Sequence, residues 1–155
     1  MLQLCFNTGT ILVNKGGLWM EERLAEAKRI AEGILNAPKY YFKDLKPSAL
    51  EDKRAAVYAI TDTATGEVLY VGRTKNIRQR LYYNHLMGPV TNARLKKYLM
   101  EDCARPEITD LAEAKAYLKE NCYAQYIQVD DMVRRGQIEG LLSFILNVRY
   151  IHEEH

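Results

Sequence analysis

Apolar residues recur along this chain with two different periods, and each period predicts its own kind of element. Between residues 19 and 36 they follow a helical spacing, with acidic residues in the first turn and a proline soon after the last. We therefore expect an amphipathic helix near the start of the chain. The apolar positions that define its stripe are Met20, Leu24, Ala27, Ala31, Ile34 and Leu35.

A strand pattern begins near residue 57 and predicts a hairpin. Residues 57–60 and 68–71 are rich in β-branched and aromatic side chains, and the DTATGE stretch between them offers Gly66 for a positive φ. Tyr58 and Tyr70 have matching parity within their strands. If a bulge near Gly66 aligns the two strands, both phenols lie on one face as near-diagonal neighbours.

The later elements follow the same two periods, and the stretch KYYFKDLKP between the first helix and the hairpin is interpreted as a connection. Asp110 is the expected cap of one helix, because an acceptor at that position satisfies free backbone amides. The expected elements are helices over 76–85, 92–102 and 111–120, a third strand over 122–129, and a final helix from Asp130 or Asp131 to about Tyr150.

Strands and helices are segregated along the chain, so the predicted fold class is α+β. We expect a small three-stranded, mainly antiparallel sheet, made of the hairpin plus one later strand and flanked by helices, with an extra N-terminal helix. A chain of 155 residues is long enough for one domain with a hydrophobic core. The predicted division is an N-terminal arm and helix over residues 1–53 and a main domain over 54–155, packed as a single globular unit.

Charge is distributed unevenly, although the formal net charge is only +2. Residues 68–100 contain seven Lys and Arg residues and no Asp or Glu. Such a local excess is what contact with the phosphates of a nucleic acid requires. The alternative is a solvated helix face, but solvated faces usually mix both signs.

Several classes of protein are disfavoured by the remaining sequence features. No run approaches the roughly 20 apolar residues of a membrane span, and the opening residues lack the basic region and cleavage site of a secretory signal. Cys5, Cys103 and Cys122 form no CxxC pair, which argues against a disulfide framework or a zinc site. We expect a cytoplasmic protein with reduced thiols and no membrane partner.

Glu139 is an isolated carboxylate in an apolar segment. It is the only charged residue between Gly136 and Val148, a stretch whose stripe of Ile138, Leu141, Ile145 and Val148 is expected to be buried. A carboxylate that close to a core is costly unless a cation partners it, and a divalent metal is one such cation. The alternative is a surface glutamate one step away from the stripe.

Two tyrosine motifs and two arginines resemble the signature of the GIY-YIG nuclease superfamily. Ala56-Val57-Tyr58 is followed by Tyr70-Val71-Gly72, then Arg73, and then Arg80 eight residues after the glycine. The segment TKNIRQRL and the late glutamate fit the same pattern, so the resemblance covers about residues 54–150. It implies an endonuclease that hydrolyses DNA phosphodiester bonds with a single Mg²⁺ or Mn²⁺ ion held by Glu139.

The resemblance also implies roles for the other site residues. Tyr58 and Tyr70 would position or deprotonate the attacking water, although a phenol with an ordinary pKa near 10 is a weak base at neutral pH. The fork of donors on Arg80 suits the oxygens of a phosphate, with Arg73 as a second cation. The residues expected to bind nucleic acid are Arg73, Lys75, Arg78, Arg94 and Lys97.

The chain departs from the family pattern after Arg80, where the family usually has a histidine or tyrosine four residues later. Asn84 stands there, and His85 lies about 140° around a regular α-helix from Arg80. Either the helix is distorted so that His85 serves, or Tyr83 substitutes, or the role is absent; His85 is kept as a candidate. The family's late asparagine has no counterpart, since Asn147 is not at the matching offset.

Three functions therefore remain open. The leading one is a metal-dependent endonuclease that acts on DNA. The second is a nucleic-acid-binding module of the same fold that has lost catalysis, which the asparagine at position 84 makes credible. The third is a protein-interaction domain whose basic surface docks an acidic partner.

Overall fold

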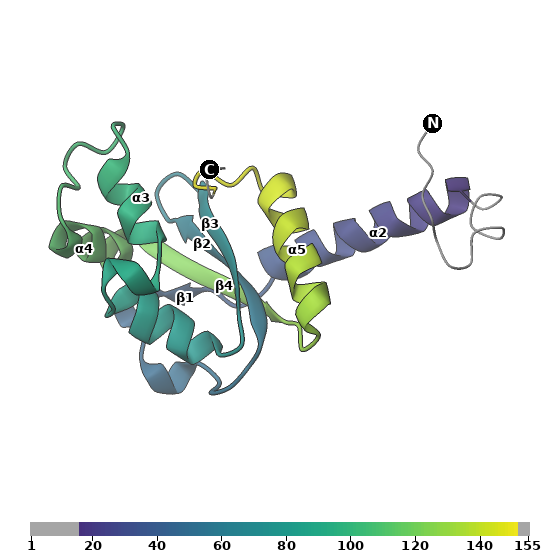
Figure 1. Ribbon diagram of the computed structural model, residues 1–155, viewed down its shortest axis with the longest axis horizontal. Coiled ribbons are helices and arrows are strands. Elements are labelled where there is room, and N and C mark those ends of the chain that lie inside the picture. The colour runs from purple at the N-terminus through teal and green to yellow at the C-terminus, as the bar shows by residue number, and fades with distance from the viewer. Residues whose placement is uncertain (1–15, 152–155) are drawn as a thin grey trace.

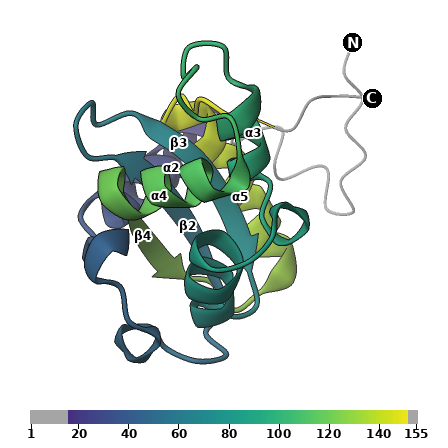
Figure 2. The same cartoon turned by 90° about the vertical axis from the view of Figure 1, so that its left-hand side faces the viewer.

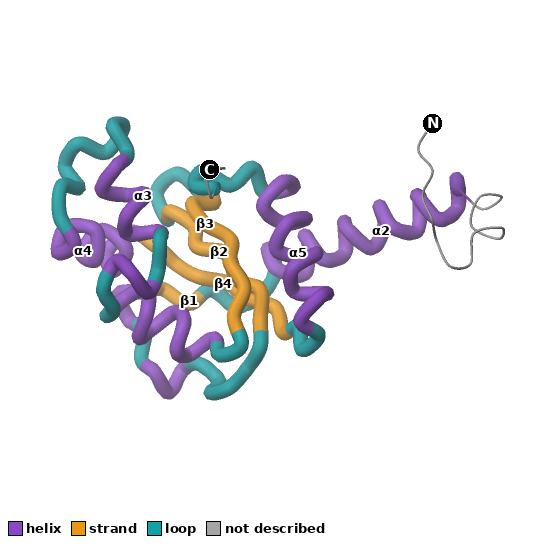
Figure 3. The backbone as a smooth tube through the Cα atoms, viewed as in Figure 1, coloured by secondary structure: helices purple, strands orange, loops and turns teal. Residues whose placement is uncertain are grey.

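The fold is built around a four-stranded antiparallel sheet with helices on both faces (Figures 1 and 3). It is seen in a computed structural model that describes residues 16–151, and the strand order is β1-β4-β2-β3. The α+β class is thus confirmed. The strands are β1 (Tyr40–Tyr41), β2 (Ala56–Asp62), β3 (Val68–Thr74) and β4 (Cys122–Gln128). The main helices are α2 (Gly16–Leu35), α3 (Leu95–Glu101), α4 (Leu111–Asn121), α5 (Met132–Ile145) and a π-helix (Gln79–Leu86).

Strand β2 lies inside the sheet, with β3 paired to one edge and β4 to the other. All of its residues are buried. Tyr58 on β2 stands opposite Gly72 on β3 and Tyr126 on β4. The prediction of three strands is wrong by one. Tyr40 and Tyr41, assigned to a connection, pair with β4 as β1. Two residues are too few to show the period of a strand, so this pairing has no signature in the sequence.

The hairpin contains the bulge that the sequence predicts, although not beside Gly66. The register shifts between Ile60 and Thr61, where Ile60 pairs with Tyr70 and Thr61 with Val68. Gly66 has the expected positive φ of 72° in the turn. The bulge leaves Tyr58 and Tyr70 on one face of the sheet.

Two apolar cores lie on the two faces of the sheet. One joins the sheet to the π-helix, α3 and α4, with Leu81, Leu99 and Leu118 fully buried; Figure 2 shows α4 in front of the strands. The other joins the opposite face to α5 and to the C-terminal part of α2 through Ile34 and Leu142. The remainder of α2 extends away from the sheet (Figure 1).

The helix ends agree with the sequence in part. Asp110 accepts from the amide of Glu113 at 2.8 Å, so the cap of α4 is confirmed, and Asp131 rather than Asp130 caps α5. The expected extension of this last helix to Tyr150 is wrong. It stops at Ile145, and Asn147 adopts a left-handed φ of 49°, a common way to end a helix.

After α5 the chain follows the outer edge of β3. The amides of Arg149 and Tyr150 donate to the carbonyl oxygens of Val68 and Leu69, each at 3.0 Å. Part of the predicted N-terminal arm (residues 1–15), Cys5 and the final residues 152–155 lie outside the described residues. None of the helices in the described part of the chain combines the length and the apolar character that crossing a bilayer requires.

Candidate active site

Tyr58, Tyr70 and His85 form an aromatic cluster on one face of the sheet. The rings of Tyr58 and Tyr70 lie 6.3 Å apart, and the His85 ring meets both edge-on at 5.5 and 5.7 Å. Tyr58 is 2% exposed and His85 is fully buried. The Tyr58 hydroxyl and the Nε2 atom of His85 are joined by a hydrogen bond of 2.8 Å. The near-diagonal placement of the two phenols is confirmed.

The π-helix explains how His85 reaches this cluster. In its i→i+5 ladder, residues five apart come onto the same side, so Arg80 and His85 lie on one side of the helix. The amide of Met87 bonds to the carbonyl oxygen of Tyr82 at 3.0 Å in this pattern. The distorted-helix alternative is therefore the observed one, and Tyr83, 45% exposed, does not join the cluster. The extra residue between Arg80 and His85 was the available signal, since π-bulges are single insertions that favour functional sites.

Gly72 makes room for the Tyr58 phenol. A methyl group at Gly72 would lie 2.5 Å from the Tyr58 hydroxyl oxygen and 2.9 Å from Cε1 of Tyr70. Cross-strand pairing places this glycine directly opposite Tyr58. The glycine of the Tyr70-Val71-Gly72 motif thus has a steric function in the site.

Arg80 brings a guanidinium to the same cluster. Its Nη1 atom donates to the carbonyl oxygen of Asn92 at 2.9 Å, while its Nε atom is buried without a hydrogen-bond partner among the described residues. An unsatisfied buried donor costs about 1–3 kcal/mol, which a bound acceptor would recover. The positive charge of Arg80 opposes the rise that burial causes in the pKa of Tyr58, and it adds to the fall that burial causes in the pKa of His85.

Glu139 joins the site from α5. Its carboxyl group is 31% exposed, and Oε2 lies 3.2 Å from Nε of Arg73. Gly136, one turn earlier on α5, leaves space for the Arg73 guanidinium, which a side chain at that position would displace. Burial is the main cause of the raised pKa of Tyr58 and Tyr70, and the negative charge of Glu139 adds to the rise for both phenols.

Burial determines which protonation states these groups have near neutral pH. Desolvation raises the pKa of Tyr58 well above its usual value of 10 and also raises that of Tyr70. Burial, together with the charges of Arg80 and Lys96, lowers the pKa of His85 to about 3. Burial raises the pKa of Glu139 as well, although Arg73 and Arg80 oppose this shift. The phenols and the imidazole are therefore neutral at pH 7.

A basic hollow of about 500 Å³ opens beside this cluster. No acidic side chain is among its lining residues, so it suits an anion. One of them, Arg135, comes from α5 and was not predicted. It is 5% exposed and donates to the carbonyl oxygens of Val129 and Asp130. Arg135 therefore adds positive charge to the hollow, while its Nη1 atom is already engaged in hydrogen bonds within the protein. The lining residues are Arg73, Thr74, Lys75, Asn76, Gln79, Arg80, Asn84, Met132 and Arg135.

The other residues predicted to bind nucleic acid differ in their exposure and in whether their charged groups already have a partner. Lys75 and Arg94 are exposed. Lys97 is exposed and pairs with Glu101 at 3.7 Å. Arg78 is half-buried, and its Nε atom donates to the carbonyl oxygen of Leu50 at 2.8 Å, so its role in binding stays a prediction.

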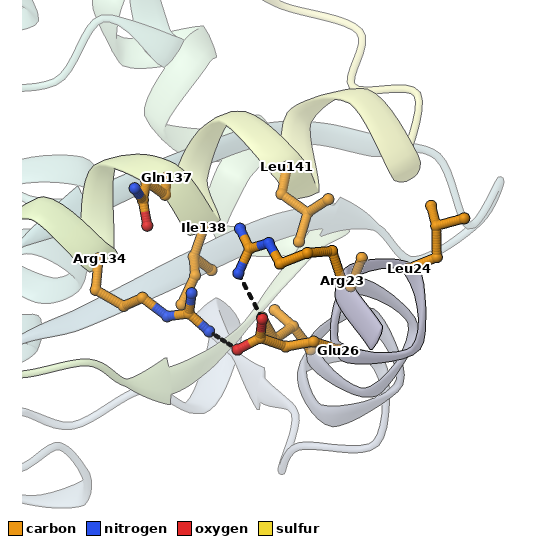
Figure 4. A pocket seen from close by; sticks show the side chains of 9 residues that line it. Arg23, Leu24, Glu26, Arg134, Gln137, Ile138 and Leu141 are labelled. Atoms are coloured by element: carbon orange, nitrogen blue, oxygen red, sulfur yellow. Dashed lines mark hydrogen bonds and ion pairs between the residues drawn. The ribbon is translucent and has the colours of Figure 1, made fainter. Parts of the chain in front are cut away.

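A second hollow, of about 220 Å³, lies between α2 and α5 (Figure 4). Glu26 pairs there with Arg134 of α5 and with Arg23 of its own helix. None of the predicted site residues lines it. It belongs to the packing of the two helices.

One comparison with known proteins bears on this geometry. Residues 54–120 match the family model of the GIY-YIG catalytic domain. The match includes both tyrosines, Arg80 and His85, and ends before Glu139. The comparisons with curated proteins and with solved structures gave no match. The match over residues 54–120, with the two tyrosine motifs joined in one hairpin, supports assignment of this segment to the GIY-YIG nuclease superfamily.

Proposed function

We propose that this protein is a metal-dependent endonuclease that hydrolyses DNA phosphodiester bonds. The family implies a nuclease with a nucleic acid substrate. The observation that carries the proposal is the packing of the two phenols with His85, beside a basic hollow that is lined by Arg80 and by Arg73, the partner of Glu139. The proposed catalytic unit spans residues 54–155, because Glu139 on α5 completes it.

The carboxylate fits a hydrated divalent ion. GIY-YIG nucleases generally use a divalent metal ion. The described residues contain no cluster of three or more His, Cys, Asp or Glu side chains, but Mg²⁺ commonly binds through one carboxylate plus waters and substrate phosphate. In the observed ion pair, Nε of Arg73 lies 3.2 Å from Oε2 of Glu139. We therefore assign Mg²⁺ or Mn²⁺ to Glu139, where it would act as a Lewis acid toward the phosphate and the leaving oxygen.

Arg80 and Arg73 are proposed to hold the scissile phosphate. The unpartnered Nε of Arg80 and the position of both arginines on the lining of the hollow support this role. A guanidinium offers parallel donors that match two phosphate oxygens. The two cations thereby offset the negative charge that grows on the phosphate during hydrolysis.

Tyr58 and His85 are proposed to handle the proton of the attacking water. The neutral phenol holds the water, takes its proton and passes the hydroxyl proton to Nε2 of His85 along the 2.8 Å hydrogen bond. An imidazolium forms, and the bound phosphate supplies the negative charge that stabilises it. Tyr70, whose ring lies 6.3 Å from that of Tyr58, is proposed to orient the same water.

Cleavage of supercoiled plasmid, single-stranded DNA and RNA, with Mg²⁺, Mn²⁺ or excess EDTA, tests the proposed function. We expect cutting of DNA only in the presence of a metal ion. One observation favours a second function, a binding module without catalysis: the ion pair with Arg73 competes with a metal for Glu139. Salt-sensitive DNA binding without cutting under any metal condition would select that module.

His85 is expected to stay neutral across the physiological pH range. Its NMR ring signals should not move between pH 5 and 8, because its pKa is lowered to about 3. The unfolded chain takes up this proton near pH 6.5, so protonation destabilises the fold as pH falls below that value. The signals are assigned by their loss in His85→Asn. A midpoint near pH 6.5 for His85 would contradict the buried pair.

Gly72→Ala is expected to displace the Tyr58 hydroxyl and slow cleavage by about a hundredfold, since a shift of about 1 Å at a reacting group has effects of that size. The added methyl group meets the hydroxyl oxygen at 2.5 Å, so we also expect a loss of about 1–3 kcal/mol in unfolding free energy. Kinetics and thermal unfolding measure both. Gly33→Ala, where a methyl group meets nothing within 4 Å, is the control. Wild-type cleavage by Gly72→Ala would refute the steric role.

A further inference from the structure

Lys96 is a fully buried lysine within the basic segment of the chain. Its Nζ atom donates to the carbonyl oxygens of Asn84 at 2.6 Å, His85 at 2.9 Å and Gly88 at 2.7 Å. An ammonium group has three donors, so these bonds use all of them. The head group of Lys96 is therefore satisfied inside the protein and has no donor left for a substrate.

The three acceptors lie at and just beyond the C-terminal end of the π-helix (Gln79–Leu86). The last carbonyl groups of a helix have no partner within the helix, and a cation there is favourable. The chain folds back on this end at Gly88. A methyl group there would lie 2.7 Å from the carbonyl oxygens of both Tyr83 and Asn84, so only a glycine fits this close approach. Lys96 thus binds both the last turn and the loop that covers it.

One of the three acceptors is the carbonyl oxygen of His85 itself. The same residue bonds to Tyr58 through its ring, while its Nδ1 atom is buried without a hydrogen-bond partner among the described residues. The side chain therefore makes one hydrogen bond, and the backbone contact with Lys96 fixes the residue from its other end. Movement of this peptide group would move the imidazole.

We propose that Lys96 is a positioning residue that locks the carbonyl end of the π-helix and thereby holds the imidazole of His85 against the hydroxyl of Tyr58. This inference rests on the proposed nuclease function only for the measurements of DNA cleavage; the NMR measurements of His85 do not depend on it. Burial and the nearby charge of Lys115 lower the pKa of Lys96 to about 8, so the ammonium persists at neutral pH. A phosphate-binding role, the ordinary one for a lysine in a basic segment, would require an accessible head group.

Lys96→Met keeps most of the aliphatic stem and removes the ammonium. We expect kcat for DNA cleavage to fall by about 10- to 100-fold, because misplacement of a catalytic group by about 1 Å has effects of this size. KM and the DNA dissociation constant should change less than about twofold, because the ammonium of wild-type Lys96 is not available to DNA. The NMR ring signals of His85 should shift and become pH-dependent. Lys119→Met, at an exposed position on α4, should match the wild type in every measurement.

The outcomes separate this inference from the proposed function. Weaker, less salt-sensitive DNA binding with unchanged kcat would make Lys96 a substrate ligand and overturn the proposal. If the wild-type protein cuts no DNA, the nuclease assignment fails, while unchanged His85 signals in Lys96→Met would still overturn the positioning role. If Lys96→Met does not fold, Lys96→Gln, which keeps two N–H donors, is measured with the same readouts and criteria.

Discussion

Glu139→Gln is expected to lower the rate of metal-dependent DNA cleavage by about a thousandfold, because loss of Lewis-acid stabilisation raises the barrier by several kcal/mol. The amide keeps the shape of the side chain but removes the charge that a hard cation requires. DNA binding should be retained or slightly tighter, since one negative charge leaves the basic hollow. Single-turnover cleavage and a binding titration on the same preparation measure both effects.

The stability of Glu139→Gln should stay close to that of the wild type. The ion pair lost is the one with Arg73, whose side chain is 51% exposed, and exposed pairs contribute about 0–1 kcal/mol. A loss of cleavage therefore cannot be attributed to unfolding. Glu120→Gln, an exposed carboxylate on α4, provides the matched control. Wild-type turnover by Glu139→Gln would remove the acid from the mechanism.

Arg80→Ala is the second change for which we expect a large effect, a loss of about 10²- to 10³-fold in kcat, the usual cost of removing a donor to developing charge. Its charge acts on Tyr58, Tyr70 and His85, so the change affects every group in the aromatic cluster. The measurement is the single-turnover cleavage rate at saturating enzyme, so that weaker binding is not mistaken for slower chemistry.

Arg80→Lys separates charge from geometry. The lysine keeps a positive charge but loses the fork of donors, so we expect a rate between those of the wild type and Arg80→Ala. Arg80→Ala removes the 2.9 Å bond to the carbonyl oxygen of Asn92, which costs about 1 kcal/mol of stability. Arg29→Ala, an exposed arginine on α2, controls for loss of a surface charge. Equal turnover in Arg80→Ala and the control would exclude a direct role of Arg80.

The hairpin and its two phenols were predictable because strand parity is a local property. Tyr58 and Tyr70 lie on one face whenever their strands pair with the bulge that the turn requires. The half-buried carboxylate of Glu139 was predictable for a similar reason, since an isolated charge in an apolar helix stands out in the sequence. Short patterns were thus sufficient to single out these residues.

The remaining features depend on long-range packing, for which the sequence has no period. Strand β1 forms because β4 offers an open edge to two tyrosines. α5 ends early because Asn147 adopts a left-handed conformation and the next residues bond to β3. The sequence does not distinguish Lys96 from the other basic residues of its segment. In the structure its ammonium group points inward and donates to three carbonyl oxygens.

The π-helix is an intermediate case. Its effect on His85 was one of the alternatives open at the level of the sequence, because an offset of five residues from Arg80 suits an i→i+5 ladder. What selects it is the fold itself, through the bond of His85 to Tyr58 and the contacts of Lys96 and Gly88 at the end of the helix. These contacts join segments far apart in the chain.

The most direct test of the account is the position of a divalent ion in a crystal grown with Mn²⁺ and a DNA oligonucleotide. Anomalous scattering locates the ion independently of any assumption about the site. We expect one Mn²⁺ bound to the carboxylate of Glu139, at about 2.1 Å as for other hard cations of this size, with waters and a DNA phosphate completing its shell. An ion bound elsewhere, with Glu139 still paired only to Arg73, would contradict it.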